Sequence, residues 1–214
     1  MYFEGPIAES YEKPQHTVRK RIATLTSNIF NPFLIGIALM LLALLASTPS
    51  WSDALKWLLL LTCINVLPIA LFMVYLVRRD KLESLFANVR RQRTRLYAMA
   101  TFLFGVSCIL LLFLDAPLIL LAMFVTTFSA NVVFMCVNLR WKVSLHAAFG
   151  TSAVIVLLIL YGFKSAAFVS SAALIPLIAW ARIELERHSL SQVIIGALLA
   201  SSILVAVFYL FGLI

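Results

Sequence analysis

Charged residues are scarce in this sequence. Asp, Glu, Lys and Arg make up 12% of its 214 residues, whereas 63% are hydrophobic, and the mean hydropathy is +1.04. Soluble domains carry about twice that share of charge. The composition therefore excludes a water-soluble globule and predicts an integral membrane protein. It leaves no room for a Rossmann, P-loop or zinc-finger domain outside the bilayer.

The few charges leave long stretches of the chain uncharged. A helix needs roughly 20 apolar residues to cross a hydrocarbon core of about 30 Å, with about 17 as a lower bound. Seven stretches meet that bound, so we expect an all-α, polytopic transmembrane bundle of six to seven spans. The uncharged stretches are 33–52, 57–77, 96–114, 116–139, 147–163, 165–181 and 189–214.

Cysteine is also rare. Cys63, Cys108 and Cys136 lie singly within the uncharged stretches, without the spacing of a metal site. We expect them to be small, buried apolar side chains. We expect neither a metal ion nor another cofactor.

The charges that remain are mostly positive. The net charge is +8 and the isoelectric point is about 9.8. Binding to nucleic acid would need a basic domain with interleaved aromatic residues, and the sequence contains none. Anionic membrane lipids are therefore the expected partners of these charges.

An amphipathic pattern precedes the first uncharged stretch. Apolar residues recur at helical spacing from Val18 to Phe30, while Arg19, Lys20 and Arg21 fall outside that stripe. This pattern predicts a short interfacial helix, which Pro32 ends. We divide the chain into an N-terminal tail with this helix, 1–30, and a single transmembrane domain, 31–214. The apolar stripe consists of Val18, Ile22, Leu25 and Ile29.

The distribution of Lys and Arg predicts the orientation in the membrane. Positive charge close to the ends of spans is retained on the cytoplasmic side. With seven spans, fifteen of the 17 Lys and Arg residues share the side of the N-terminus, and only Lys56 and Lys164 lie on the other. We therefore expect a cytoplasmic N-terminus, cytoplasmic basic loops and an external C-terminus.

Three of the cytoplasmic connections combine basic residues with serine or histidine. They lie at 79–97, 141–146 and 181–192, each separated from the next by two spans. Because they share one membrane face, helix packing can bring them together. Guanidinium and ammonium groups bind phosphate oxygens, and imidazoles transfer protons and groups. The three connections together predict a phosphate site.

These connections resemble the three motifs of the type-2 phosphatidic acid phosphatase superfamily, K-x6-R-P, P-S-G-H and S-R-x5-H-x3-D. Arg182 and His188 keep the spacing of the third motif, and Gln192 stands in place of its aspartate. Ser144 and His146 keep the second motif. The match covers roughly residues 55–214. This variant arrangement of the motifs resembles a bacterial subgroup of the superfamily.

The first motif departs furthest from the family pattern. Eight residues separate Lys81 from Arg90 where the family has six, and Arg93 is an equally good candidate for the arginine. The second motif has Leu145 where the family has glycine. The arginines between 90 and 95 would serve equally well as topology anchors or lipid headgroup contacts.

The resemblance implies a membrane-embedded lipid phosphatase of the bacterial inner membrane. It implies hydrolysis, without a metal ion, of a phosphomonoester or diphosphate of an isoprenoid or phosphatidate lipid, through a phosphohistidine. His188 would be the nucleophile, and His146 would protonate the leaving oxygen. Residue 192 would orient His188. The phosphate oxygens would be bound by Lys81, Arg90 or Arg93, Ser144 and Arg182, with Lys142 as a further candidate.

The replacement of aspartate by Gln192 has a predictable consequence. An amide oxygen that accepts a hydrogen bond from one nitrogen of His188 can fix the tautomer, but it stabilises an imidazolium less than a carboxylate does. Helical spacing would place Glu184 on the same face as His188, where it could supply the missing negative charge.

Three functions remain open from the sequence. The first is the lipid phosphatase. The second is a catalytically impaired subunit with a structural or lipid-binding role in a homo-oligomer or a larger membrane complex, which Gln192 and Leu145 favour. The third is a small transporter, although the uncharged spans lack the acidic or basic residues that mark an ion path.

Overall fold

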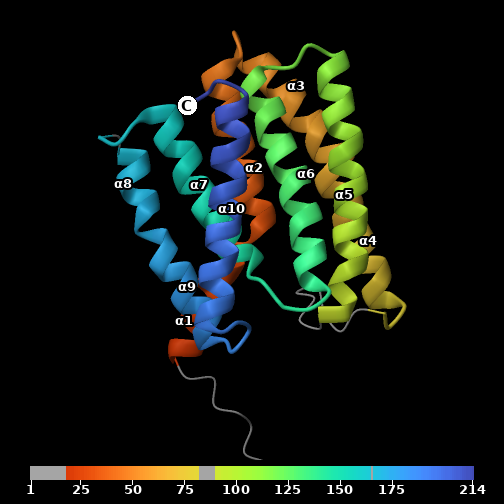
Figure 1. The fold of residues 1–214 in the computed structure, drawn as a ribbon, viewed down its shortest axis with the longest axis vertical. Coiled ribbons are helices and arrows are strands. Elements are labelled where there is room, and N and C mark those ends of the chain that lie inside the picture. Colours follow the sequence, from red (N-terminus) through yellow and green to blue (C-terminus); the bar gives the residue numbers. More distant parts are fainter. Residues whose placement is uncertain (1–17, 82–89, 165) are drawn as a thin grey trace, which may run out of the picture.

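The structure is a computed structural model that describes residues 18–81, 90–164 and 166–214, with the side chains at 90, 91 and 167 also outside the description. Residues 1–17 of the predicted N-terminal segment 1–30 lie outside the described residues. All regular elements of the described ranges are helical (Figure 1). They are α1 (Val18–Ile29), α2 (Pro32–Ser47), α3 (Trp51–Leu61), η1 (Thr62–Val66), α4 (Leu67–Arg78), α5 (Arg90–Phe113), α6 (Leu118–Asn138), α7 (Leu145–Tyr161), α8 (Ala166–Ala172), α9 (Leu174–Glu184) and α10 (Leu190–Leu210).

Successive long helices run in opposite directions along the bundle (Figure 1). The end of α4, the start of α5, the α6–α7 connection, the α9–α10 connection and α1 all lie at one end, the lower end in Figure 1. We call it the basic end. The α2–α3 and α5–α6 turns and the C-terminus lie at the opposite end. The three basic connections of the sequence therefore share one end of the bundle.

Several helices are long and apolar enough to cross a membrane. Four segments meet that description, Trp51–Arg78, Gln92–Phe113, Leu118–Asn138 and Leu190–Leu210. A fifth is present if α1 and α2, bent by 43°, count as one span, and α7 is a shorter apolar helix. The protein is thus an all-helical membrane protein. The count of six to seven spans stays a prediction.

The uncharged stretch 165–181 does not form one helix. It is divided at Ala173 between α8 and α9. Pro176, in the first turn of α9, has no N–H with which to continue the hydrogen-bond ladder of α8, and its ring would collide with the carbonyl of residue 172. The proline therefore explains why two short helices replace the single predicted span.

A proline also shapes the segment from α3 to α4. The π-helical turn η1 precedes Pro68, and the Leu67 N–H bonds to the Thr62 carbonyl five residues back. This wider turn makes room for the proline ring. Asn65 lies in this turn, and its side chain exchanges two hydrogen bonds, of 2.8 and 3.1 Å, with the side chain of Ser107 on α5. Both side chains are fully buried.

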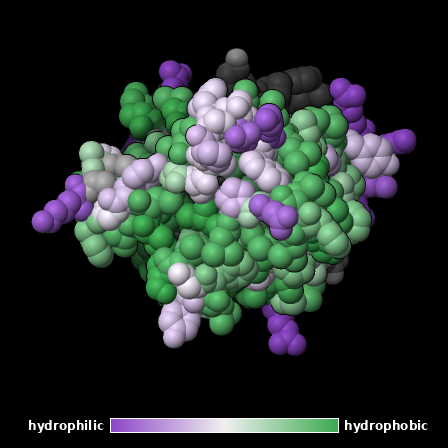
Figure 2. Space-filling view, turned by 90° about the horizontal axis from the view of Figure 1, so that it is seen from above, coloured by the Kyte–Doolittle hydropathy of each residue, from purple (hydrophilic) through white to green (hydrophobic). Residues whose placement is uncertain are grey.

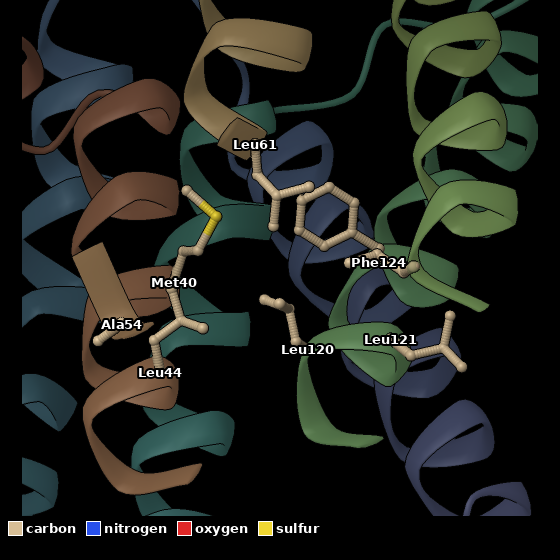
Figure 3. Close-up of a cluster of buried hydrophobic side chains, with 8 residues drawn as sticks. Met40, Leu44, Ala54, Leu61, Leu120, Leu121 and Phe124 are labelled. Atoms are coloured by element: carbon tan, nitrogen blue, oxygen red, sulfur yellow. The ribbon is translucent and has the colours of Figure 1, made fainter. Parts of the chain in front are cut away.

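Hydrophobic side chains fill the centre of the bundle and also cover its outside. One buried cluster joins α2, α3, α5 and α6 near the end opposite the basic end, with Met40, Leu61 and Phe124 converging in Figure 3. Large hydrophobic side chains such as Leu71, Phe102 and Leu198 are exposed on the helices. Hydrophobic residues also dominate the end of the bundle that is seen from above in Figure 2, where hydrophilic ones are confined to patches and projections. Such an exterior suits a lipid environment. Our expectation of buried cysteines was wrong for Cys63 and Cys136, which are exposed on this apolar exterior.

Helix α1 occupies the residues predicted for an amphipathic helix. Its apolar stripe is exposed, from 50% for Ile22 and Ile29 to 72% for Val18. The opposite face, which carries the small residues Ala23, Thr26 and Ser27, is buried against α9. The helix therefore covers part of the basic end with its small-residue face and leaves its apolar stripe free for lipid.

Candidate functional site

Helix α10 holds the α6–α7 connection at the basic end. Ser144 is fully buried, and its backbone N–H bonds to the Gln192 carbonyl at 3.2 Å. Its side chain is the N-cap of α7 and accepts a hydrogen bond from the Ala147 N–H. Gly196 lies against the Ser144 backbone so closely that an added Cβ would come within 2.7 Å of the Ser144 oxygen. The segments of the second and third motifs are therefore in direct contact.

Two cations connect further segments to this pair. Lys142 donates a hydrogen bond of 2.8 Å from Nζ to the Arg187 carbonyl in the α9–α10 connection. Arg93 of α5 is buried and donates one of 3.0 Å to the Val143 carbonyl. The three basic segments thus meet at one place, with Arg93 as the contributor from the first segment.

His188 is held by Gln192. The ring is 5% exposed, and its Nδ1 lies 3.1 Å from the Gln192 Oε1. An amide oxygen can only accept, so Nδ1 carries the hydrogen and Nε2 of the neutral ring is unprotonated. The hydrogen bond that we expected between these two residues is present. Gln192 also completes a capping box with Ser189 at the start of α10, so it has a structural role as well.

Arg182 and His146 meet at a residue that the motifs do not include. Arg182 is 3% exposed and donates a hydrogen bond of 2.7 Å from one terminal nitrogen to the hydroxyl of Ser27 on α1. The Nε2 of His146 lies 3.2 Å from the Ser27 carbonyl oxygen and 3.4 Å from its hydroxyl. Because a carbonyl accepts, this nitrogen carries a hydrogen. Ser27 therefore bridges the two residues.

The electrostatics of the cluster favour an anion. Burial, followed by the charges of Arg93 and Arg182, holds the pKa of His188 well below its usual value. Burial and the neighbouring arginines also lower the pKa of Lys142, to about 8. Within the described ranges, Lys142 and Arg182 form no ion pair with a carboxylate, and the Arg182 Nε is buried without a hydrogen-bond partner. The site has an excess of positive charge that an anion would relieve.

Two predicted phosphate ligands are not placed in this cluster. Lys81 is exposed just after α4 and makes no side-chain hydrogen bond or ion pair with the described residues. The side chain of Arg90 lies outside the described residues. Of the first-motif candidates, Arg93 alone among the described side chains reaches the cluster.

Our expectation for Glu184 was wrong. Helix α9 ends at this residue, so it does not share a helical face with His188. Its carboxylate lies 3.0 Å from Arg19 of α1, and Glu186 lies 3.4 Å from Lys20. These two carboxylates hold α1 and do not compensate for the missing aspartate.

Ser27 is the residue that sequence reasoning missed. The apolar stripe of α1 identified the helix as amphipathic, and its opposite face was left unassigned. Ala23 and Ser27, four residues apart, form a small-residue face of the kind that allows close helix packing. That pattern indicated a packed face, but not what it packs against.

The groups assembled here are of the chemical types that bind a tetrahedral anion and transfer a group from it. Two buried guanidinium groups, a half-buried ammonium group, a serine hydroxyl, one imidazole with an unprotonated nitrogen and one with an N–H converge there. A hollow of about 550 Å³ lies at the opposite end of the bundle, between Trp57 and Asp115, and is not part of this site. No family model, curated protein or solved structure matches the chain, so its function must be inferred from this arrangement of residues.

Proposed function

We propose that the protein is an integral-membrane lipid phosphatase that works without a metal ion. The observation that carries the proposal is the meeting of Arg93, Lys142 and Arg182 around a neutral histidine whose Nδ1–H is bound by Gln192. A doubly charged phosphate is the common ligand that uses several cations together with a nucleophilic imidazole.

In this proposal the phosphate group is held by donors from three segments. Arg182 and Lys142 bind its oxygens from the third and second motifs, and Arg93 binds from α5. The hydroxyl hydrogen of Ser144 is available to a further oxygen, because the hydroxyl serves the cap of α7 as an acceptor. Fixed donors of this kind stabilise the charge that spreads over the phosphoryl oxygens in the transition state.

The chemical steps follow from the protonation of the two histidines. The unprotonated Nε2 of His188 attacks phosphorus as the bond to the leaving oxygen breaks. The negative charge of the bound phosphate favours uptake of a second proton by His146, and this imidazolium gives the leaving oxygen a proton and becomes neutral. Water then attacks the phosphohistidine, loses a proton to His146 and releases inorganic phosphate. His188 returns to its starting neutral form. The amide of Gln192 keeps the tautomer correct throughout.

The substrate in this proposal is a phosphorylated lipid of the isoprenoid or phosphatidate type, because the site lies at one end of a bundle with an apolar exterior. We place the protein in a bacterial inner membrane with seven passes, formed by α2, α3–α4, α5, α6, α7, α8–α9 and α10. The basic end faces the cytoplasm, where its arginines and lysines also meet anionic lipids.

Phosphate release from a panel of lipid phosphates by the detergent-solubilised protein tests the proposal. We expect hydrolysis of at least one member of the panel, and a loss of at least 1000-fold, on the order of what removal of a nucleophile costs, in His188→Ala. Thermal unfolding of both proteins would show that the variant is folded. Equal phosphate release by the two proteins would refute the proposal.

A second function is favoured by two observations at the same site. Gln192 is neutral where the family has a carboxylate, and Ser27 occupies donors of Arg182 and His146. A phosphatase-like subunit of a homo-oligomer or larger membrane complex, which binds a lipid phosphate without cleaving it, would keep the cations and lose the turnover. Binding of a lipid phosphate without release of phosphate would support this alternative.

A further inference from the structure

Helix α1 lies over the cationic cluster and reaches it through one residue. The hydroxyl oxygen of Ser27 accepts a hydrogen bond from Arg182 at 2.7 Å, and its carbonyl oxygen accepts one from His146 at 3.2 Å. Ser27 is 5% exposed. Two oxygens of one residue therefore bind a guanidinium and an imidazole N–H, as two oxygens of a single phosphate group would.

Ser27 satisfies these donors only in part. The Nε of Arg182 is buried and has no hydrogen-bond partner, although Arg182 as a whole is 3% exposed. A buried donor of a charged group that lacks a partner costs free energy, which a further acceptor would recover. A phosphate has three non-bridging oxygens, so it offers one more acceptor than Ser27 does.

The attachment of α1 makes its release feasible. Its outer contacts with α9 are the ion pairs Arg19–Glu184 and Lys20–Glu186, and the Arg19 side chain is 68% exposed. The hydrophobic core clusters of the described residues contain no α1 residue. The buried residues of α1 are the small Ala23, Thr26 and Ser27, and at least one side chain of each ion pair is largely exposed. Small side chains bury little apolar area and such ion pairs contribute little stability, so α1 can leave the site without disrupting the bundle.

We propose that α1 is a displaceable seal on the site, in which Ser27 takes the place of two phosphate oxygens until a phosphate group displaces it. The inference rests on the proposed phosphate site and adds a competing element to it. In the sealed form His146 donates its Nε2 hydrogen to Ser27, so proton transfer to a leaving oxygen requires that α1 move.

Two variants weaken the seal by independent routes. Ser27→Ala removes the hydroxyl that Arg182 binds. Arg19→Glu places a carboxylate opposite Glu184, and the double variant Arg19→Glu with Glu184→Arg restores an ion pair. Arg19→Glu makes the protein less positive, so tighter anion binding in this variant cannot come from added positive charge.

The measurement is the dissociation constant for inorganic phosphate in detergent, with hydrogen exchange of the α1 amides as a second readout. We expect Ser27→Ala to bind phosphate about tenfold more tightly, the factor that loss of one competing charge-assisted hydrogen bond predicts. Arg19→Glu should bind a few-fold more tightly, as the loss of one partly exposed ion pair predicts, and the double variant should bind like wild type. Saturating phosphate should speed exchange in α1 of the wild-type protein.

Weaker binding by Ser27→Ala would overturn the inference, because Ser27 would then be a ligand of the phosphate. Unchanged binding of both inorganic phosphate and phosphatidate by the two single variants, or no binding of either ligand by any protein, would also overturn it. Tighter binding in both single variants without hydrolysis of any lipid phosphate would support the seal and refute the phosphatase. Hydrolysis of a lipid phosphate by the wild-type protein, with unchanged ligand binding in both single variants, would support the phosphatase and refute the seal.

A second titration distinguishes a free phosphate ion from a lipid headgroup as the group that displaces α1. The same proteins are titrated with phosphatidate in vesicles of a neutral lipid. Tighter binding of both ligands by Ser27→Ala means that the phosphate group itself displaces α1. Tighter binding of phosphatidate alone assigns the displacing group to a lipid headgroup at the membrane surface.

Discussion

The hydrogen bond between His188 and Gln192 determines which ring nitrogen is available for chemistry. Nδ1 is occupied by the amide oxygen at 3.1 Å, so the lone pair of the neutral ring is on Nε2. Burial, followed by the surrounding cations, keeps the pKa of the ring low, so it stays neutral at physiological pH. A neutral amide therefore suffices for orientation, while a carboxylate would add stabilisation of the charged ring.

Substitution of Gln192 separates orientation from charge. We expect Gln192→Leu to lose activity on the order of 100-fold or more, because a ring held in the wrong tautomer cannot attack phosphorus. Gln192→Asp should retain activity or raise it, because its carboxylate still accepts the hydrogen bond and stabilises the imidazolium. Steady-state hydrolysis of the best lipid phosphate measures both.

Gln192 also belongs to the capping box of α10, so the comparison needs a control for helix stability. Ser189→Ala removes the hydroxyl that accepts from the Gln192 N–H and leaves the contact with His188 in place. We expect it to lower thermal stability and to change activity only a few-fold, because an N-cap is worth about 1 kcal/mol. Wild-type activity in Gln192→Leu would show that residue 192 does not orient His188.

Lys142 gives the site a dependence on pH. Burial and the charges of Arg93, Arg182 and Arg187 lower its pKa to about 8. Its proton is therefore lost as the pH rises through that value, and the lowered pKa also means that stability increases between this value and the ordinary lysine pKa.

Loss of the Lys142 charge should weaken phosphate binding on the alkaline side. We expect kcat/KM, which reports the ionisation of the free enzyme, to fall above about pH 8. In Lys142→Arg the fall should move to higher pH, because a guanidinium stays protonated. A pH profile with the same alkaline limb in both proteins would assign the limb to another group.

At the scale of elements, the crossing of α10 over the α6–α7 connection positions the site. A Cβ at position 196 would come within 2.7 Å of the Ser144 oxygen and 3.1 Å of its nitrogen. These are backbone atoms, which cannot rotate away as a side chain can. The distance between α10 and Ser144 is therefore set by the absence of a side chain at Gly196.

Gly196→Ala should disturb the site without touching a charged group. We expect a loss of about 1–3 kcal/mol in stability, the usual cost of overpacking, together with reduced hydrolysis because Ser144 and His146 shift. Thermal unfolding in detergent and phosphate release measure the two effects. Gly36→Ala is the matched control, because its Cβ would meet only the Phe149 ring at 3.4 Å. Equal behaviour of the two variants would contradict the expectation.

The sequence predicts the helices and part of the site because both follow from local patterns. Runs without charge locate α2, α5, α6 and α10, and the apolar stripe from Val18 to Ile29 locates α1. Successive loops of a helical bundle alternate between its two ends, so the segments that carry Ser144 and His188 are predicted to lie at the same end. The hydrogen bond from His188 to Gln192 follows from their spacing at the start of a helix.

Other features depend on how helices pack, which local patterns do not encode. The contact of Ser27 with Arg182 joins residues 155 positions apart and depends on the angle at which α1 leaves α2. The pairing of Glu184 with Arg19 depends on the same placement. The break between α8 and α9 does not depend on packing in this way, because Pro176 in the sequence accounts for it.

At the scale of the whole molecule, the alternating helix directions predict opposite membrane sides for the two ends of the bundle. We expect Arg140→Cys, in the exposed α6–α7 connection, to react with an impermeant maleimide only from the cytoplasmic side, and Lys164→Cys only from outside. Both are made in a background that lacks Cys63, Cys108 and Cys136. Intact cells and inverted vesicles provide the two sides, and reaction of both variants from one side would overturn the seven-pass topology.

The pair formed by Asn65 and Ser107 has a consequence for how the bundle assembles. Its two hydrogen bonds join η1 to α5 inside an otherwise apolar contact. If α4 slid along α5 by one turn, both polar groups would lose their partners where no water can replace them. Apolar side chains tolerate such a shift far better, because lipid and protein offer them similar surroundings. The pair therefore favours one register between η1 and α5, the helix whose start carries Arg93.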